Sequence, residues 1–167
     1  MKRIWMIDFI LFSTGIILDQ ITKYMAMGLE NRPPIVLIEN VLELHHTGNR
    51  GAAFGVLQGG RIYFIIIAAV VFIIIGWILK KIPSDKKYGK LHIALSLILA
   101  GAAGNTIDRV IRGYVIDFIY FKIINFPIFN VADIYITVAT FWLAAMILFF
   151  FKEEDFDFLR KNNGSGE

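Results

Sequence analysis

Four long apolar stretches constrain the fold of this chain more than any other feature of its sequence. They cover residues 4–27, 62–79, 91–107 and 134–151. A helix needs about 20 predominantly apolar residues to cross roughly 30 Å of hydrocarbon, and each stretch is near that length. The first follows Lys2 and Arg3 as a secretory signal would, but three more apolar stretches follow it, so we interpret it as a retained span. The sequence therefore predicts four membrane-spanning helices.

The composition agrees with this prediction and excludes several other classes of protein. Of the 167 residues, 57% are hydrophobic, compared with roughly 45–50% apolar residues in soluble domains. A soluble fold of this length could not bury so much apolar surface. The absence of cysteine excludes disulfides, thiolate metal sites and a cysteine nucleophile. A net charge of +3 is too small to indicate a nucleic-acid partner, and we expect none.

The basic residues predict which side of the membrane each loop faces. Five lysines lie between the second and third stretches: Lys80, Lys81, Lys86, Lys87 and Lys90. Further basic residues flank the first and last stretches. Because cytoplasmic loops carry the excess of Lys and Arg, this loop and both termini are predicted to be cytoplasmic. Two segments, about 30–58 and 110–132, are then predicted to be extracytoplasmic.

The first of these segments contains a predicted hairpin. Residues 35–44 (IVLIENVLEL) are rich in strand-forming side chains and have a candidate turn at Glu39–Asn40. Residues 47–55 (TGNRGAAFG) form a small-residue loop that suits close approach of another backbone. We predict one all-α membrane domain over residues 1–161, a four-helix bundle with a small β-rich extracytoplasmic part and both termini in the cytoplasm. Residues 162–167 (NNGSGE) are predicted to be a disordered tail.

Polar residues recur close to the predicted extracytoplasmic ends of the spans. They are Asp19, Lys23, Asn49, Asn105, Asp108, Arg109, Asp117, Asn130 and Asp133. Ionisable groups at membrane depth are costly, and by default they mark a functional site or a structural ion pair. Because the predicted topology brings five of them to one depth, we expect these five to converge: Asp19, Asn49, Asp108, Asp117 and Asp133.

Two pairs among these residues have a structural interpretation beside the functional one. Asp19 and Lys23 are four residues apart, so they can form an ion pair on one face of a helix. Asn130 and Asp133 have the spacing of a helix N-cap followed by an acidic third position. The sequence leaves both interpretations open for each pair.

Asp117 is harder to explain by structure alone. It lies within VIDFIYF (residues 115–121), with no adjacent cation and no turn residue. By contrast, Asp108 and Arg109 are expected to fix the end of the third span at the interface. Asp117 is therefore the strongest single indication of a functional site.

The types of residue present limit the chemistry. There is no HExxH zinc motif and no GxSxG nucleophile motif. Ser96, within the third span, is predicted to have no Lys or His near enough to activate it. Two carboxylates that share a proton remain, and such a pair can act as general acid and general base toward water. The sequence thus predicts acid–base hydrolysis without a metal, a cofactor or a covalent nucleophile.

A membrane carrier that uses intramembrane acids as proton relays is the alternative class. A carrier would have acids spread across the membrane depth and inverted repeats. The second span has no charge, the third is predicted to have polar groups only at one end, and no repeat is visible. We therefore favour hydrolysis over transport.

Five motifs occur in order along the chain. They are DQITK (19–23), NRGAAFG (49–55), GNTIDR (104–109), VIDF (115–118) and FNVAD (129–133). On a frame of four spans, they make the chain resemble lipoprotein signal peptidase, the bacterial signal peptidase II family, over nearly its whole length. Any one of the motifs alone would be a weak indication.

The resemblance implies an aspartic endopeptidase of the bacterial cytoplasmic membrane, with its active site near the extracytoplasmic face. Such enzymes remove the signal peptide of a prolipoprotein just before a cysteine that already carries diacylglyceryl. The resemblance places the catalytic aspartates at Asp117 and Asp133, and the presence of both argues against an inactive relative. The supporting or substrate-binding residues would be Asp19, Lys23, Asn49, Gly51, Asn105, Asp108, Arg109 and Asn130. The antibiotic globomycin is expected to occupy this site, membrane lipids are expected partners, and we expect a monomer.

Overall fold

The computed structural model describes residues 2–51 and 60–160 of the chain. Four long helices dominate it: α1 (Lys2–Met27), α2 (Arg61–Lys81), α3 (Gly89–Ile111) and α4 (Val131–Phe149). Each helix is long and apolar enough to cross a membrane, so the predicted set of four such helices is confirmed. Residues 52–55 of the predicted small-residue loop and the predicted tail at 162–167 lie outside the described residues.

α3 is the central helix of the bundle. It packs against α1, α2 and α4, and 61% of its most apolar window is buried, compared with 17% in each of the other helices. Small residues make this possible: a side chain at Gly101 would bring its Cβ within 2.5 Å of the Ala132 carbonyl oxygen on α4. A side chain at Gly104 would collide with the carboxylate of Asp19 on α1. Small residues let membrane helices approach closely, and here they place α1 and α4 against the same helix.

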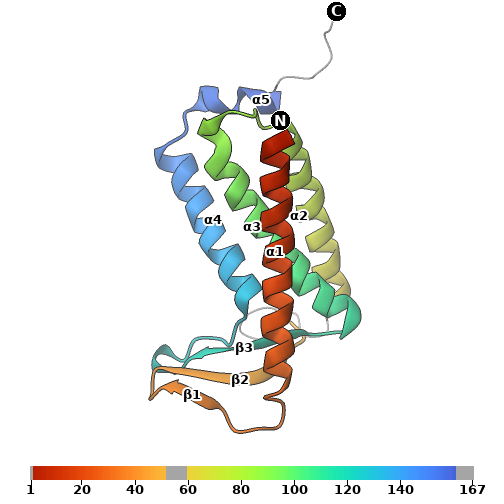
Figure 1. Cartoon of the computed structure of the whole chain (residues 1–167), viewed down its shortest axis with the longest axis vertical. Helices are drawn as coiled ribbons and strands as arrows, with labels where there is room; N and C mark the ends of the chain where they lie inside the picture. Colours follow the sequence, from red (N-terminus) through yellow and green to blue (C-terminus); the bar gives the residue numbers. More distant parts are fainter. Residues whose placement is uncertain (1, 52–59, 161–167) are drawn as a thin grey trace, which may run out of the picture.

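A three-stranded antiparallel sheet, in the order β1-β2-β3, lies across one end of the bundle, which we call the sheet end (Figure 1). The strands are β1 (Ile35–Ile38), β2 (Leu42–Asn49) and β3 (Val115–Phe121). The turn between β1 and β2 includes Asn40, whose positive φ of 56° is a conformation that Asn tolerates better than most residues. The predicted hairpin is therefore confirmed.

β3 is a strand that the sequence analysis did not predict. It comes from the second predicted extracytoplasmic segment and pairs antiparallel with β2, with Thr47 opposite Asp117. The backbone of Phe129, just before α4, continues the sheet through hydrogen bonds with Ile119 (2.9 and 3.1 Å). The sheet therefore connects the segment after α1 to the start of α4.

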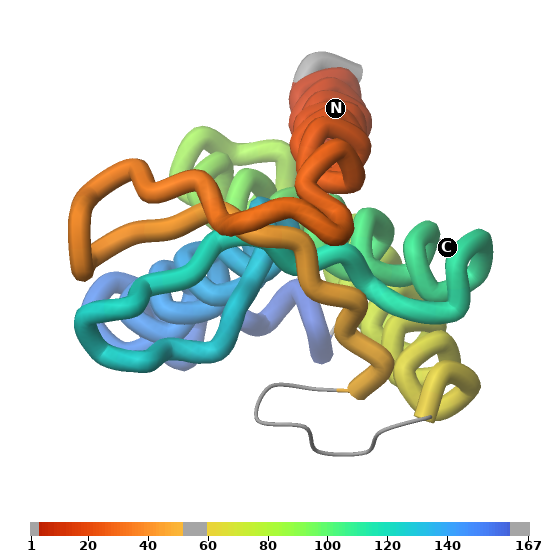
Figure 2. The backbone as a smooth tube through the Cα atoms, turned by 90° about the horizontal axis from the view of Figure 1, so that it is seen from below, coloured from red at the N-terminus to blue at the C-terminus, as the bar shows by residue number. Residues whose placement is uncertain are grey.

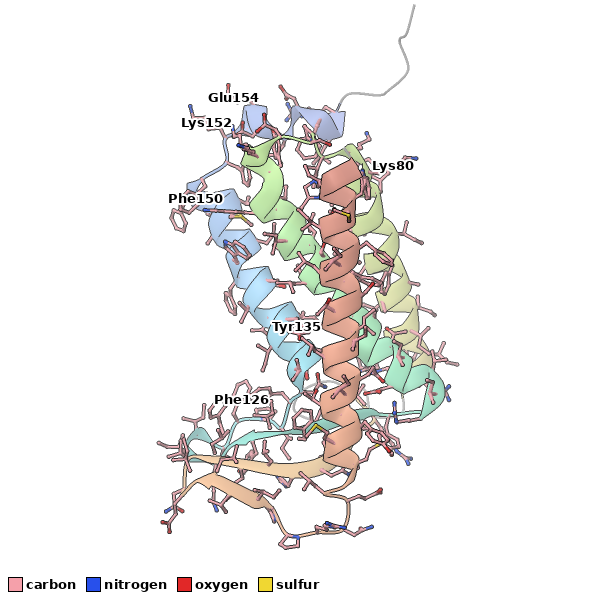
Figure 3. All side chains as sticks on the ribbon, in the orientation of Figure 1. Lys80, Phe126, Tyr135, Phe150, Lys152 and Glu154 are labelled. Carbon is pink, nitrogen blue, oxygen red and sulfur yellow. The ribbon has the colours of Figure 1, made fainter. Side chains whose placement is uncertain are left out.

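The other end of the bundle, the terminal end, holds the N-terminus and the described end of the chain. Three short elements lie there: the 3-10 helices η2 (Lys86–Tyr88) and η4 (Glu153–Phe156), and α5 (Asp157–Arg160). Tyr88 stacks on Phe151 with ring centroids 5.9 Å apart, and Lys87 forms an ion pair with Asp155. These contacts hold the segment after α4 against the loop between α2 and α3. Lys80 and Lys152 lie at this end (Figure 3), but the orientation of the bundle in the membrane stays a prediction.

Candidate active site

The two candidate catalytic aspartates come from different elements at the sheet end. Asp117 lies in the middle of β3, and its side chain is buried, with 2% exposed. Asp133 is the third residue of α4 and is partly buried. The sheet carries β3 to the first turn of α4, so both carboxylates lie at the same end of the bundle.

Asparagine side chains connect the two carboxylates. The Asn130 amide donates hydrogen bonds to Asp117 Oδ1 (2.6 Å) and to Asn105 Oδ1 (3.2 Å). The Asn105 amide in turn donates to Asp133 Oδ1 (2.8 Å). On the other side, the Asn49 amide donates to Asp117 Oδ2 (2.8 Å). Asp117 and Asp133 therefore belong to one hydrogen-bonded chain, which fixes their relative positions.

The predicted N-cap of α4 is confirmed, and it belongs to the same site. Asn130 Oδ1 accepts a hydrogen bond from the Asp133 backbone N–H, and Asp133 Oδ2 accepts one from the Asn130 backbone N–H, both at 3.1 Å. This capping box satisfies two backbone groups that a helix start would leave unpaired. The structural and the functional interpretations of this pair are therefore compatible, because different atoms of each side chain serve the two roles.

A buried lysine lies behind the carboxylates. Lys23 Nζ is 2.9 Å from Asp19 Oδ2 and 3.0 Å from Asp108 Oδ2, and all three side chains are 0% exposed. The predicted ion pair of Asp19 with Lys23 is therefore confirmed. Lys23 also donates to Asn105 Oδ1 (2.8 Å). We call Asp19, Lys23, Asn105 and Asp108 the Lys23 cluster.

Lys23, together with Asn130, fixes which way the Asn105 amide points. Lysine has only donors, so the group of Asn105 that faces Lys23 must be its oxygen. The NH₂ group of Asn105 then faces Asp133. Lys23 thus acts on one candidate catalytic carboxylate without touching it.

The prediction for Asp108 and Arg109 is correct only in part. Asp108 fixes the end of α3 as expected: it forms an ion pair with Arg112 (2.6 Å) and accepts a hydrogen bond from the Ile116 backbone N–H (3.3 Å). Arg109 instead faces the site, and its guanidinium lies over the ring of Phe64 at 4.5 Å. Neither Arg112 nor Phe64 was predicted from the sequence. The i, i+4 spacing of Asp108 and Arg112 was a visible signal for the first, whereas nothing in the sequence pairs Arg109 with Phe64.

Gly51 contributes through its backbone. Its N–H donates to Asn49 Oδ1 (2.9 Å), and its carbonyl oxygen accepts from Arg109 Nη2 (3.3 Å). The described part of the predicted small-residue loop thus takes part in the site, but the partners of the Gly51 backbone are the side chains of Asn49 and Arg109 and not another backbone.

Burial raises the pKa of Asp117 to about 6, and the negative charge of Asp133 acts in the same direction. Hydrogen bonds from Asn49 and Asn130 oppose this rise because they favour the charged form. Near neutral pH, Asp117 therefore retains a proton far more often than an ordinary aspartate.

A pocket of about 720 Å³ opens beside the carboxylates. Its polar part is formed by Asn49, Gly51, Asn105, Arg109, Asp117 and Asp133. Its apolar part includes Phe64 of α2, Ile134 and Val138 of α4, and Phe121, Phe126, Ile128 and Phe129 at the sheet. Figure 3 shows Phe126 at the sheet end, and Figure 2 shows α2 and α4 well apart there, with α1 on the other side of the bundle. The pocket therefore offers an apolar surface between two spanning helices, with two carboxylates at one end.

A second group of buried polar side chains lies on α1 and α3, farther from the sheet than the Lys23 cluster. His92 Nδ1 is 2.7 Å from Asp8 Oδ2, and the Ser96 hydroxyl donates to Asp8 Oδ1 (3.1 Å). All three residues are at most 6% exposed, and none of them lines the pocket. We call these three residues the Asp8 cluster.

The Asp8 cluster corrects two expectations. Ser96 does have a histidine nearby, because His92 lies one helical turn before it on α3, and α3 has polar groups toward both of its ends. Its hydroxyl nevertheless bonds to the carboxylate and not to the imidazole, so the cluster lacks the contact that activates a serine nucleophile. The i, i+4 spacing of His92 and Ser96 was visible in the sequence, but their partner on α1 was not. In the described part of the chain, no three His, Asp or Glu side chains are grouped as metal ligands would be.

Comparison with known proteins gives one consistent result. The family model of signal peptidase (SPase) II matches residues 11–149. The chain is 48% identical to the lipoprotein signal peptidase of Brevibacillus brevis over 124 residues, 74% of this chain and 82% of the relative. It is 40% identical to that of Anoxybacillus flavithermus over 153 residues, 89% of this chain and 88% of the relative. A solved structure of a bacterial membrane enzyme at 2.3 Å resolution has a TM-score of 0.74 and 31% identity, covering 96% of this chain and 94% of that one.

The fold and the site define a multi-pass membrane protein with a candidate hydrolytic centre at one end of its bundle. Family and fold matches agree with that class over most of the chain. The chain belongs to the signal peptidase II family, whose members remove signal peptides from prolipoproteins. The resemblance based on the five motifs is thereby confirmed.

Proposed function

We propose that this protein is an aspartic endopeptidase that cleaves diacylglyceryl-modified prolipoproteins immediately before the lipidated cysteine, with Asp117 and Asp133 as its catalytic pair. The observation that carries the proposal is the hydrogen-bonded chain that joins these two carboxylates at one end of an apolar pocket. Nothing else in the described site has the chemistry to activate water.

The pKa of Asp117, raised to about 6, supports placing the shared proton on this residue. Asp133 then acts as the general base: it takes a proton from a water molecule, whose oxygen attacks the carbonyl carbon of the scissile bond. Asp117 gives its proton to the carbonyl oxygen. When the tetrahedral intermediate collapses, the proton on Asp133 passes to the leaving nitrogen and Asp117 recovers its own. The C–N bond breaks, and the lipidated cysteine is left with a free amino group.

The pocket supports the same substrate class. Its apolar wall between α2 and α4 suits a hydrophobic signal helix, because that helix would arrive from the membrane with its apolar side chains already in lipid. The diacylglyceryl chains of the cysteine would stay in the bilayer while the extended peptide reached the carboxylates. The antibiotic globomycin would compete for this space.

The charges of the loops support an orientation with the terminal end in the cytoplasm. Lys80 and Lys152 lie at that end (Figure 3), as the positive-inside rule requires of cytoplasmic segments. The sheet end and the carboxylates would then face the outside of the bacterial cytoplasmic membrane. A single chain supplies both carboxylates and their hydrogen-bond partners, which supports a monomeric enzyme.

Cleavage of a lipid-modified prolipoprotein by the purified protein in lipid vesicles tests the proposal. Asp117→Asn and Asp133→Asn should each lower the cleavage rate by about 10²–10⁴-fold, as expected when a general acid or base is lost. Mass spectrometry of the product should give a new N-terminus at the modified cysteine. The surface variant Lys122→Met is the control and should cleave normally. If a folded Asp117→Asn or Asp133→Asn protein cleaved at the normal rate, the catalytic assignment would be wrong.

A further inference from the structure

The direction of the Asn49 side chain depends on Gly51. Because the Gly51 N–H holds the side-chain oxygen of Asn49 (2.9 Å), the side-chain nitrogen is presented to Asp117 Oδ2 (2.8 Å). If Gly51 moved, the amide of Asn49 would be free to turn, and Asp117 would lose this hydrogen bond. The position of one glycine backbone thus controls a contact to a candidate catalytic carboxylate.

Arg109 holds Gly51, but its own hydrogen bonds are long. One guanidinium nitrogen donates to the Gly51 carbonyl oxygen and another to the Asn105 carbonyl oxygen, each at 3.3 Å. Contacts of this length, at the outer limit for N–H···O bonds, fix a flexible side chain only weakly. The guanidinium has a further contact: it lies over the ring of Phe64, 4.5 Å from its centroid, within the range of a cation–π interaction.

Phe64 is well anchored for this role. It lies in the first turn of α2, where its backbone N–H donates to the Gly60 carbonyl oxygen (3.2 Å). In the same turn, Arg61 donates to the Val110 carbonyl oxygen near the end of α3 (2.7 Å). The start of α2 and the end of α3 are therefore joined twice, by this hydrogen bond and by the contact of the Phe64 ring with Arg109.

We propose that Phe64 is a positioning residue: its ring holds Arg109 against the Gly51 carbonyl group and thereby keeps Asn49 hydrogen-bonded to Asp117. The contacts run from Phe64 on α2 to Arg109 on α3. They continue through Gly51 to Asn49 at the end of β2, and they end at Asp117 on β3. This inference rests on the proposed function, because the hydrogen bond from Asn49 matters for cleavage only if Asp117 is catalytic. Phe64 thus has a different role from the other apolar residues of the pocket, which we expect to contact the substrate.

Phe64→Leu tests the proposal because leucine keeps an apolar side chain and removes the π face. On the plateau of the pH–rate profile, below about pH 6, loss of one aligned hydrogen bond should lower kcat by about tenfold. Since the Asn49 hydrogen bond lowers the pKa of Asp117, its loss should move the alkaline limb of the pH–rate profile upward by about one pH unit. Phe64→Tyr keeps the ring and should retain both kcat and the profile. Phe64→Met, another variant without a ring, should repeat the result of Phe64→Leu.

Tyr63→Leu is the matched control, because it removes a neighbouring aromatic ring that is 66% exposed and lies outside the pocket. It should leave cleavage unchanged. If Phe64→Leu raised only KM and left the pH profile in place, the ring would be a substrate contact and the proposal would be overturned. A normal Phe64→Leu enzyme beside an inactive Asp117→Asn enzyme would overturn this inference alone and leave the proposed function intact.

A double-mutant cycle with Arg109→Gln adds a readout that a merely structural role would not change. If Phe64 acts through Arg109, the change Phe64→Leu should cost little further activity once the cation at position 109 is gone. Strictly additive losses in the two backgrounds would contradict the proposed path.

Discussion

The Lys23 cluster and the Asp8 cluster lie on the same pair of helices, yet only the first is connected to the pocket. Both clusters are buried, and both join α1 to α3. The Lys23 cluster has a cation and lies near the sheet. The Asp8 cluster combines a carboxylate, an imidazole and a hydroxyl farther along the bundle.

The difference between the clusters lies in their outward contacts. Lys23 orients the Asn105 amide, which donates to Asp133 (2.8 Å), so the ion pairs are connected to the candidate catalytic carboxylates. The Asp8 cluster has no such continuation: in the described residues, His92 Nε2 is buried without a hydrogen-bond partner. Burial of polar groups in a membrane bundle therefore does not by itself identify a functional site, and a connection to the pocket is the feature that distinguishes the two clusters.

The dependence of the cleavage rate on pH should show the largest difference between the pocket carboxylates and the Asp8 cluster. The pKa of Asp117 is raised to about 6, so this residue keeps its proton up to that pH and loses it above. With both carboxylates charged, no general acid remains, and kcat/KM should fall about tenfold per pH unit above about 6, or roughly 100-fold by pH 8. Steady-state cleavage across this range measures the effect.

Asp8→Asn is the comparison for the pH experiment, because it removes a buried carboxylate that has no contact with the pocket. Its profile should coincide with that of the unchanged protein. A shifted limb in Asp8→Asn would show that the two clusters are coupled, and a flat profile from pH 6 to pH 9 in the unchanged protein would contradict the role of Asp117.

Lys23→Met should have the next largest effect. It leaves the buried carboxylates of Asp19 and Asp108 without their shared cation, which typically costs about 3–5 kcal/mol in free energy of unfolding. It also removes the shorter of the two hydrogen bonds that hold Asn105 Oδ1 (2.8 Å from Lys23, 3.2 Å from Asn130), so cleavage should fall even at temperatures where the protein stays folded. Thermal melting in detergent and cleavage at low temperature separate the two losses.

Lys122→Met is the control for this change, because Lys122 forms an ion pair with Glu43 on the sheet and is half exposed. Its melting temperature should scarcely change, since exposed ion pairs contribute little. Equal melting temperatures for Lys23→Met and Lys122→Met would show that the buried cluster does not stabilise the bundle.

Asp8→Asn should have the smallest effect of the three on function and a moderate effect on stability. Asparagine can still accept one hydrogen bond, so the expected loss is about 1–3 kcal/mol in free energy of unfolding, with cleavage unchanged. Parallel melting and cleavage measurements test this combination. A folded Asp8→Asn protein with no activity would show that the Asp8 cluster is also needed for cleavage.

Much of the fold could be predicted because it depends on local sequence. Stretches of membrane length identify the four helices, and the Glu39–Asn40 turn identifies the hairpin. β3 was missed because its apolar residues resemble the ends of the neighbouring spans, and only its pairing with β2 defines it as a strand. Local patterns do not show which distant segment supplies a partner strand.

The same limit applies to the site. Asp117 was singled out because nothing nearby in the sequence explains it, and the capping pattern of Asn130 and Asp133 is local. The contact of Arg109 with Phe64 and that of Asp8 with His92 depend on how closely the helices pack. The small residues that allow this packing can be read from the sequence, but the facing residues cannot.

The double role of Asn130 has a practical consequence for finding inhibitors. The same side chain caps α4 and holds Asp117, so a compound that engages the carboxylates also reinforces the first turn of a membrane helix. A ligand present at 100 times its Kd adds about 2.7 kcal/mol to folding free energy. Compounds can therefore be screened by the rise in melting temperature they cause, without preparing a lipidated peptide for every assay.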